Sequence, residues 1–278
     1  MRIDAHQHFW RYSSEEYAWI DESMRAIRRD FLPADLAPAL AAAQLDGSVA
    51  VQARQSLAET DWLLAIANSS PLIKGVVGWI PLAAEGENIG GLLDRYHDQT
   101  LLKGVRHVLQ AEPDTYFSDP GFNAALDEIA RRNLSYDLLV FARQLPAALA
   151  WIDGHPNLRI VVDHIAKPVV DGTPTPEWRA HMRELARRPN LFCKFSGVVT
   201  EAPGWRWSMD QIRPYFETAL EAFGPHRLMF GSDWPVCLVA VDYARWHSTV
   251  EGLVQPLSPA ERSAIMGGTA TAFYQLAS

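Results

Sequence analysis

Short apolar runs alternate with helix-like segments along almost the whole chain, and this alternation is the feature that most limits how it can fold. We expect eight strands, the first around His6 and His8 and the others at residues 47–52, 73–80, 102–109, 134–140, 158–164, 191–196 and 228–233. The segments between them predict helices at residues 35–44, 59–68, 88–97, 119–133, 144–154, 176–188 and 209–223. Strands that read as continuous apolar runs are typical of sheets buried on both faces.

Regular strand–helix alternation indicates parallel βαβ units and therefore the α/β class. Eight such units fit a closed (β/α)₈ barrel of the TIM type, and chains of 278 residues are common for such barrels. An open doubly wound sheet is the alternative, but it usually has a glycine-rich turn after the first strand, where this chain has His8-Phe-Trp-Arg-Tyr12. We found no linker or internal repeat, so we predict one domain over residues 1–278.

The composition excludes several classes of partner. The formal net charge of −8 argues against binding to nucleic acid, which needs a basic surface. No apolar run reaches the roughly 18 residues of a membrane helix, and no leader-like segment stands at the start. The two cysteines, Cys193 and Cys237, are far apart and fit a reducing compartment, so we expect a cytoplasmic protein.

Two histidines near the start of the chain form the first candidate site. His6 and His8 are separated by one residue, and residues two apart on a strand point to the same face. Their ring nitrogens can bind one divalent metal, for which zinc is the expected ion. By itself an HxH pattern also occurs by chance, so the interpretation depends on what the other strands contribute.

Polar residues stand at the carboxyl ends of several other predicted strands, where barrels place catalytic groups. Asp233 ends the eighth strand in the sequence Phe230-Gly-Ser-Asp-Trp-Pro235, where a carboxylate can bind a metal and accept a proton from water. A turn or capping aspartate is the alternative. His164 ends the sixth strand beside Asp163. Because neighbours in a regular strand face opposite ways, we expect only His164 to enter the site, unless it is a core histidine bonded to backbone.

Four motifs together resemble the amidohydrolase superfamily. They are Asp4-Ala-His-Gln-His-Phe-Trp10, Lys103-Gly-Val-Arg-His-Val-Leu-Gln-Ala-Glu-Pro-Asp114, Asp163-His-Ile-Ala-Lys-Pro168 and Phe230-Gly-Ser-Asp-Trp-Pro235, and they span most of the chain. Within this superfamily the chain resembles the amidohydrolase-2 branch, and most of all its sugar lactonases, such as L-fucono- and L-rhamnono-lactonases. The resemblance implies a TIM-type barrel that hydrolyses an aldonolactone, with a divalent metal in at least some members.

The chain departs from the metal-binding members of this superfamily at two strands. Binuclear relatives place a carbamylated lysine at the functional end of the fourth strand, whereas Lys103 lies at its start. Relatives also place a histidine on the fifth strand, where this chain has none. The resemblance therefore reduces the expected ligands to His6, His8 and Asp233 around at most one metal. Since some relatives work without metal, a metal-independent reaction stays open.

For lactone hydrolysis we expect Asp233 to move the proton and His164 to assist as a second catalytic residue. His107 and Arg106 on the fourth strand, with Arg54 after the second, are candidates for substrate binding. Either arginine could equally form a structural ion pair. Trp234 is one of several loop tryptophans that could stack on a sugar, although packing is the ordinary role.

Three functions fit these residues. The first is a sugar-acid lactonase acting on L-fucono-1,5-lactone or a relative such as L-rhamnono-1,4-lactone. The second is a hydrolase or decarboxylase of a carboxylated aromatic-pathway compound such as 2-pyrone-4,6-dicarboxylate, which would need more cationic groups in the pocket. The third is a sugar-binding barrel without activity. The long connection over residues 11–30 is a candidate pocket lid, and a homo-oligomer stays open.

Overall fold

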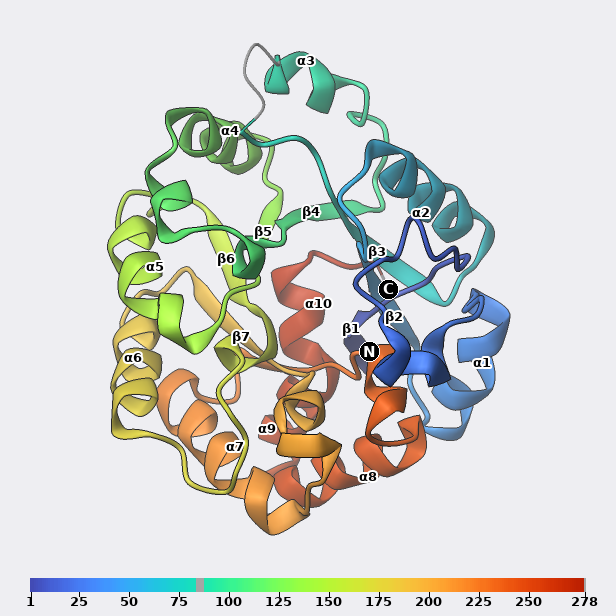
Figure 1. Cartoon of the computed structure of the whole chain (residues 1–278), viewed down its shortest axis with the longest axis vertical. Coiled ribbons are helices and arrows are strands. Elements are labelled where there is room, and N and C mark those ends of the chain that lie inside the picture. The colour runs from blue at the N-terminus through green and yellow to red at the C-terminus, as the bar shows by residue number, and fades with distance from the viewer. Residues whose placement is uncertain (84–87, 278) are drawn as a thin grey trace.

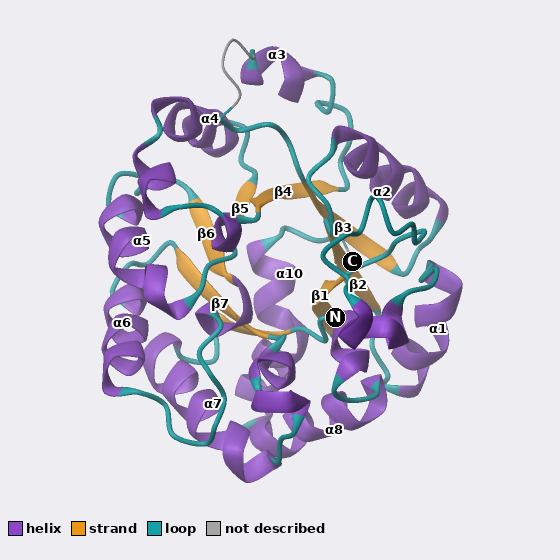
Figure 2. Ribbon diagram, in the orientation of Figure 1, coloured by secondary structure: helices purple, strands orange, loops and turns teal. Residues whose placement is uncertain are grey.

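A computed structural model describes residues 1–83 and 88–277. Its eight strands form one parallel sheet in chain order, with helices around the outside (Figures 1 and 2). The strands are β1 (Ile3–Gln7), β2 (Gly47–Val51), β3 (Ile73–Gly78), β4 (Leu102–His107), β5 (Ser135–Leu138), β6 (Arg159–Val162), β7 (Leu191–Phe195) and β8 (Leu228–Phe230). The predicted (β/α)₈ barrel is thus confirmed.

The sheet is joined between its first and last strands by backbone hydrogen bonds just beyond β8. The N–H of Asp233 donates to the carbonyl oxygen of His6 at 2.8 Å, and the N–H of His8 donates to that of Trp234 at 2.6 Å. A register irregularity interrupts β1 between Asp4 and Gln7. These two bonds bring the ends of β1 and β8 together and so position the first and last candidate residues.

The helices lie where their apolar spacing indicated, with ends within a few residues of the expected ones. The main helices are α1 (Pro33–Ala42), α2 (Leu57–Ser69), α3 (Ile89–Asp94), α4 (Pro120–Arg131), α5 (Leu145–Ile152), α6 (Pro176–Ala186), α7 (Met209–Phe223), α8 (Tyr243–Val254), α9 (Pro259–Ser263) and α10 (Thr269–Phe273). In α4, Phe122, Leu126 and Ile129 are buried at helical spacing, and Asp119 caps the helix by accepting the N–H of Phe122 at 2.7 Å.

The amino-terminal end of the barrel is filled by the last helix of the chain. Phe273 and Tyr274, at the end of α10, pack against Val49, Val161 and Met229 in a cluster separate from the outer core. Figure 1 shows α10 behind the ring of strands. With this end closed, the opposite end of the barrel is left for chemistry.

The strands end one to three residues earlier than the sequence indicated, and the difference matters most at the sixth and eighth. We expected the sixth strand to continue to His164 and the eighth to Asp233, but β6 ends at Val162 and β8 at Phe230. His164, Ile165, Ala166 and Lys167 all have positive φ, between 47° and 59°, and Asp233 has a φ of 58°. Left-handed backbone costs a non-glycine residue about 1–2 kcal/mol, so neither turn is a default conformation.

The connection over residues 11–30 folds back on itself. Trp10 and Phe31 exchange two backbone hydrogen bonds at its base, and the hydroxyl of Tyr17 donates to Glu59 of α2 at 3.2 Å. Figure 1 draws this segment in front of β1 and β2. Its role as a lid stays a prediction. No helix in the described part of the chain is both long and apolar enough to span a membrane.

Candidate active site

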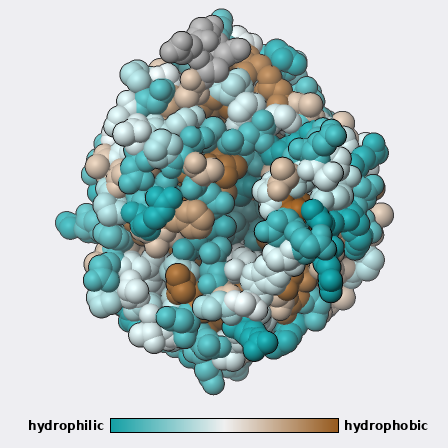
Figure 3. Space-filling view, viewed as in Figure 1, coloured by the Kyte–Doolittle hydropathy of each residue, from teal (hydrophilic) through white to brown (hydrophobic). Residues whose placement is uncertain are grey.

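Three side chains from the two ends of the sheet meet at the carboxyl end of the barrel. His6 lies on β1, His8 directly follows it, and Asp233 lies three residues beyond β8. All three are buried. Figure 3 shows this face of the molecule hollowed near its centre, with mostly hydrophilic residues around the hollow. The predicted ligand set is therefore gathered at the mouth of the barrel.

The spacing of their ligand atoms fits one small divalent ion. Nε2 of His8 lies 3.3 Å from Nε2 of His6 and 3.3 Å from Oδ1 of Asp233, and the third separation, from His6 to Asp233, is 3.8 Å. Ligands about 2.0–2.2 Å from a tetrahedral zinc lie about 3.3–3.6 Å from one another. Two imidazoles and one carboxylate leave the fourth position of such an ion open, as in catalytic zinc sites.

The second nitrogen of His8 supports the same conclusion. Its Nδ1 lies 2.8 Å from the carbonyl oxygen of Val51, which can only accept a hydrogen bond, so Nδ1 carries the proton. In the neutral ring, Nε2 then carries a free lone pair that is directed at His6 and Asp233. Asp233 adds a carboxylate oxygen to the same buried place, and Nε2 of His6, which lies 3.3 Å from the guanidinium of Arg106, borders it as well, so the cluster favours a cation. The residues present therefore fit a metal.

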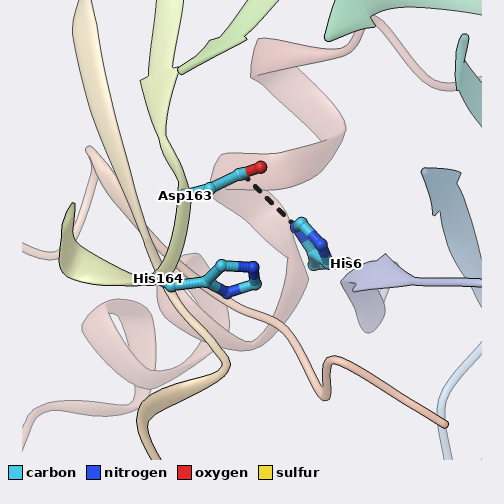
Figure 4. Close-up of side chains that lie close together, drawn as sticks. All are labelled: His6, Asp163 and His164. Carbon is cyan, nitrogen blue, oxygen red and sulfur yellow. Dashed lines mark ion pairs between the residues drawn. The ribbon is translucent and has the colours of Figure 1, made fainter. Parts of the chain in front are cut away.

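The prediction that only His164 of the Asp163–His164 pair enters the site is wrong. Because the chain turns into left-handed backbone at His164, both side chains face the barrel interior, as Figure 4 shows. Asp163 Oδ1 lies 3.3 Å from Nδ1 of His6, and Nε2 of His164 lies 4.0 Å from Asp233. His6, Asp163 and His164 form a second group of potential ligands beside the first.

Ser196, just beyond β7, determines which nitrogen of His164 faces the site. Its Oγ lies 2.9 Å from Nδ1 of His164. In the tautomer whose Nδ1 accepts the Ser196 hydroxyl, the ring proton lies on Nε2, on the side of the Asp233 carboxylate. A Cβ on Gly197 would come within 2.5 Å of the His164 ring, so a side chain at position 197 would displace it. The result is an N–H donor aimed toward Asp233.

A buried ion network lies beneath these residues, and no role was predicted for its lysine, which stands near the end of the seventh strand. Lys194 on β7 pairs with Asp137 of β5 and lies 3.0 Å from Asp163 and 3.1 Å from Nδ1 of His6. Arg106 donates to Asp163 at 3.1 Å. A lysine and an aspartate within otherwise apolar strands were the available signals for this network. It fixes His6 from below, through Asp163 and Lys194.

The surroundings set the charge of each group. Burial lowers the pKa of His164 to about 4 and holds that of His6 well below its ordinary value, so both rings are neutral at neutral pH. Burial alone would raise the pKa of Asp233, but the neighbouring histidines outweigh it and lower the pKa. Burial raises the pKa of Asp137 to about 6, against the effect of Lys194. Neutral imidazoles and an ionised carboxylate are what metal binding requires.

The four expected substrate-binding residues are already engaged within the protein. Arg106 bonds to Gln52 and Asp163, and Arg54 pairs with Glu16 in the 11–30 connection. The two ring nitrogens of His107 contact Trp79 at 3.2 Å and Glu112 at 3.1 Å. Trp234 packs edge-on against Phe9 and Phe31. Their roles toward a substrate stay predictions.

Comparisons with known proteins agree with this geometry. The family model described as "Amidohydrolase" matches residues 3–276. This chain belongs to the amidohydrolase family. An L-fucono-1,5-lactonase of Burkholderia multivorans is 43% identical over 99% of the chain and 96% of the relative, and one of Burkholderia ambifaria is 37% identical over the same shares. A crystal structure of an amidohydrolase from Burkholderia multivorans with bound zinc superposes with a TM-score of 0.94 and 43% identity, covering both chains completely.

More distant structures show the amidohydrolase fold alone. A probable 2-pyrone-4,6-dicarboxylic acid hydrolase from Acinetobacter baumannii superposes with a TM-score of 0.79 over 99% of this chain and 100% of its own, but only 17% of residues are identical. The resemblance predicted from the sequence is therefore confirmed at the level of the family and of its sugar lactonases.

Proposed function

We propose that this amidohydrolase hydrolyses a sugar lactone to the free aldonic acid, with L-fucono-1,5-lactone as the leading substrate and L-rhamnono-1,4-lactone as the next. The full-length identity to two L-fucono-1,5-lactonases supports the reaction class and the leading substrate. A shorter match to an L-rhamnono-gamma-lactonase of Scheffersomyces stipitis, 28% identical over 60% of this chain, supports the second substrate. The observation that carries the proposal is the convergence of His6, His8 and Asp233 at the barrel mouth.

We propose that these three residues hold one divalent metal, zinc by the precedent of the zinc-bound relative. When bound, the ion supplies a Lewis acid that makes a nearby water more acidic. Two histidine nitrogens and one carboxylate oxygen, two of whose three separations match tetrahedral spacing, support this choice of ion. Hydrolysis measured with and without a chelator tests whether the reaction requires the ion.

In the proposed reaction, water adds to the lactone carbonyl carbon and the ring C–O bond breaks. Asp233, held as a carboxylate, accepts the proton of the attacking water and returns it to the departing ring oxygen. His164 is neutral, and its Nε2–H donates to the carbonyl oxygen as negative charge develops there. Asp163 and Lys194 hold His6 in place beneath the reacting group.

The alternative substrate, a pyrone dicarboxylate, would need cationic groups free to bind two carboxylates. Arg106 is buried against Asp163, and Arg54 is paired with Glu16, so each arginine would first have to give up its present partner. A neutral sugar lactone makes no such demand. This difference favours the lactone over the dicarboxylate.

The test is a pH-indicator hydrolysis screen over aldono-1,4- and aldono-1,5-lactones and 2-pyrone-4,6-dicarboxylate, with and without a chelator. We expect the highest kcat/KM on an L-fucono lactone and no turnover of the dicarboxylate. Hydrolysis that disappears with chelator and returns with zinc would support the metal role, whereas unchanged hydrolysis would remove it. Failure of every lactone to react above the buffer rate would overturn the proposed function.

A further inference from the structure

A cavity lies at the opposite end of the barrel from the candidate active site. Its volume is about 500 Å³. It is bordered by the starts of β4 and β6, by the turn before β5, and by the chain after α10, which together contribute Lys103, Arg159, Asn133 and Gln275. Cavities of this size accommodate small ligands. The site lies among residues to which the lactonase chemistry gives no role.

The cavity is cationic in a protein that is acidic overall. Lys103, Arg131, Arg132 and Arg159 line it, and no aspartate or glutamate does so among the described residues, although the chain carries a net charge of −8. The rest of the wall includes hydroxyl and amide groups from Tyr96, Gln99, Thr100 and Asn133. Such a lining attracts anions and offers hydrogen-bond donors to their oxygens.

Of the four cationic side chains, Lys103 and Arg159 have no carboxylate partner among the described residues. Arg131 pairs with Glu128, and Arg132 pairs with Glu128 and Asp94, so both are neutralised at the rim. Lys103 donates to the backbone carbonyl of Gln275 at 3.1 Å, and Arg159 donates to the carbonyls of Phe273 and Asn133. Backbone carbonyls orient these side chains but do not cancel their charge.

The positive charges of Lys103 and Arg159 also repel each other, which makes the empty cavity less favourable. Burial lowers the pKa of Lys103, and the nearby positive charge of Arg159 lowers it further. Two like charges held together, partly out of water and without a carboxylate among the described residues, gain from an anion between them.

We propose that this basal cavity binds a small, multiply charged oxyanion, a phosphate ester or a polycarboxylate, between Lys103 and Arg159. The shared chemistry is a compact group of anionic oxygens able to accept from an ammonium and a guanidinium at once. The site is separate from the mouth of the barrel, so it does not depend on the proposed lactonase function.

The experiment measures the melting temperature and the dissociation constant of the purified protein with inorganic phosphate and with citrate. Sodium chloride matches the ionic strength throughout, because general screening would otherwise imitate binding. We expect at least one of the two anions to raise the melting temperature in a saturable way, as a ligand bound only to the folded state does. The anion that binds more tightly shows whether the cavity prefers a phosphate group or a set of carboxylates.

Variants at the cavity locate the binding. Lys103→Gln keeps an N–H donor for the carbonyl of Gln275 but removes the charge, so we expect it to weaken binding by about tenfold or more, the effect of losing one charged hydrogen bond. Lys103→Arg keeps the charge and should retain binding. The matched control is Arg131→Gln, whose cation is already paired with Glu128 and whose loss should change the affinity little. Equal binding by the parent and Lys103→Gln, or no saturable effect of either anion, overturns the proposal.

Discussion

The backbone N–H of Asp233 donates to the carbonyl oxygen of His6 at 2.8 Å, so the bond that joins β8 to β1 also sets the distance between two candidate metal ligands. A second bond, from the N–H of His8 to the carbonyl of Trp234, fixes the other histidine against the same turn. The left-handed conformation of Asp233 turns its carboxylate toward both rings. The hydrogen bonds that close the barrel therefore also bring the candidate metal ligands together.

Asp233→Asn is expected to lower the kcat of lactone hydrolysis by about 10²–10⁴-fold, the usual contribution of a general base, because an amide cannot accept the proton of water at neutral pH. Asparagine tolerates left-handed backbone as well as aspartate does, so the melting temperature should change only modestly. Steady-state kinetics at saturating metal, with thermal unfolding, checks both statements. Asp242→Asn is the matched control, because Asp242 caps α8 and asparagine caps about equally well. A folded Asp233→Asn enzyme within a few-fold of the parent would remove the catalytic assignment.

His164→Asn is expected to lower kcat by about 10²–10³-fold, the cost of losing one donor to a developing oxyanion. Asparagine is among the residues that best tolerate the positive φ at this position, so the fold should survive. Circular dichroism and kinetics on the same sample measure the two effects, with the exposed His226→Asn as a control. Near-parental turnover by a folded variant would make His164 a structural residue.

The barrel and the meeting of the candidate metal ligands could be predicted because each depends on a local pattern. Strand–helix alternation indicated the fold, and HxH spacing with a carboxylate after the last strand indicated His6, His8 and Asp233. Their spatial meeting then follows from barrel closure, which brings the first and last strands together.

The sixth-strand turn could not be predicted in the same way. Four successive residues with positive φ from His164 to Lys167 include no glycine, so the sequence carries no sign of the left-handed turn. The alternation of side chains along a regular strand therefore predicted, wrongly, that Asp163 points away from the site. The partners of Lys194 were equally hidden, because Asp137 and Asp163 come from other strands and meet it only through the barrel register.

Metal content provides a test independent of activity. The two groups of potential ligands share His6, so we expect at most one tightly bound equivalent per chain by elemental analysis. His8→Ala should lose this metal, because it removes the lone pair closest to both other ligand atoms. Retention of a full equivalent by His8→Ala, or two equivalents in the parent, would contradict the single site on His6, His8 and Asp233.

Lys194→Met should destabilise the fold by about 3–5 kcal/mol, the usual result of removing one partner from a buried ion pair. Without the ammonium, Asp137 and Asp163 would face each other with less compensation. Urea unfolding of this variant, of Asp137→Asn and of the double variant measures the coupling, and we expect the double variant to lose less than the sum of the single losses. Lys74→Met, at a partly exposed position, should change stability by about 0.5 kcal/mol or less. Additive losses would show that Lys194 and Asp137 do not act as a pair.

Glu59 should make the stability of the protein depend on pH. It is buried beneath the 11–30 connection, where it accepts the backbone N–H groups of Ala53 and Arg54 and the hydroxyl of Tyr17. Burial raises its pKa from 4.5 to about 7, despite the opposing effect of these hydrogen bonds. The folded state therefore binds this proton more tightly than the unfolded state, so the contribution of Glu59 is largest below pH 4.5 and is lost as the pH rises to about 7.

The glutamine of Glu59→Gln stays uncharged as the pH rises, whereas Glu59 ionises. Its amide oxygen can still accept the N–H groups of Ala53 and Arg54. We expect the variant to gain stability relative to the parent as the pH rises from 4.5 to 7, by up to about 3 kcal/mol. Urea unfolding of both proteins at several pH values in this window measures the difference. Glu128→Gln, at a partly exposed carboxylate, is the control and should show no comparable relative gain. A difference between parent and Glu59→Gln that stays constant across the window would mean that Glu59 has an ordinary pKa in the folded protein and remains charged under the connection.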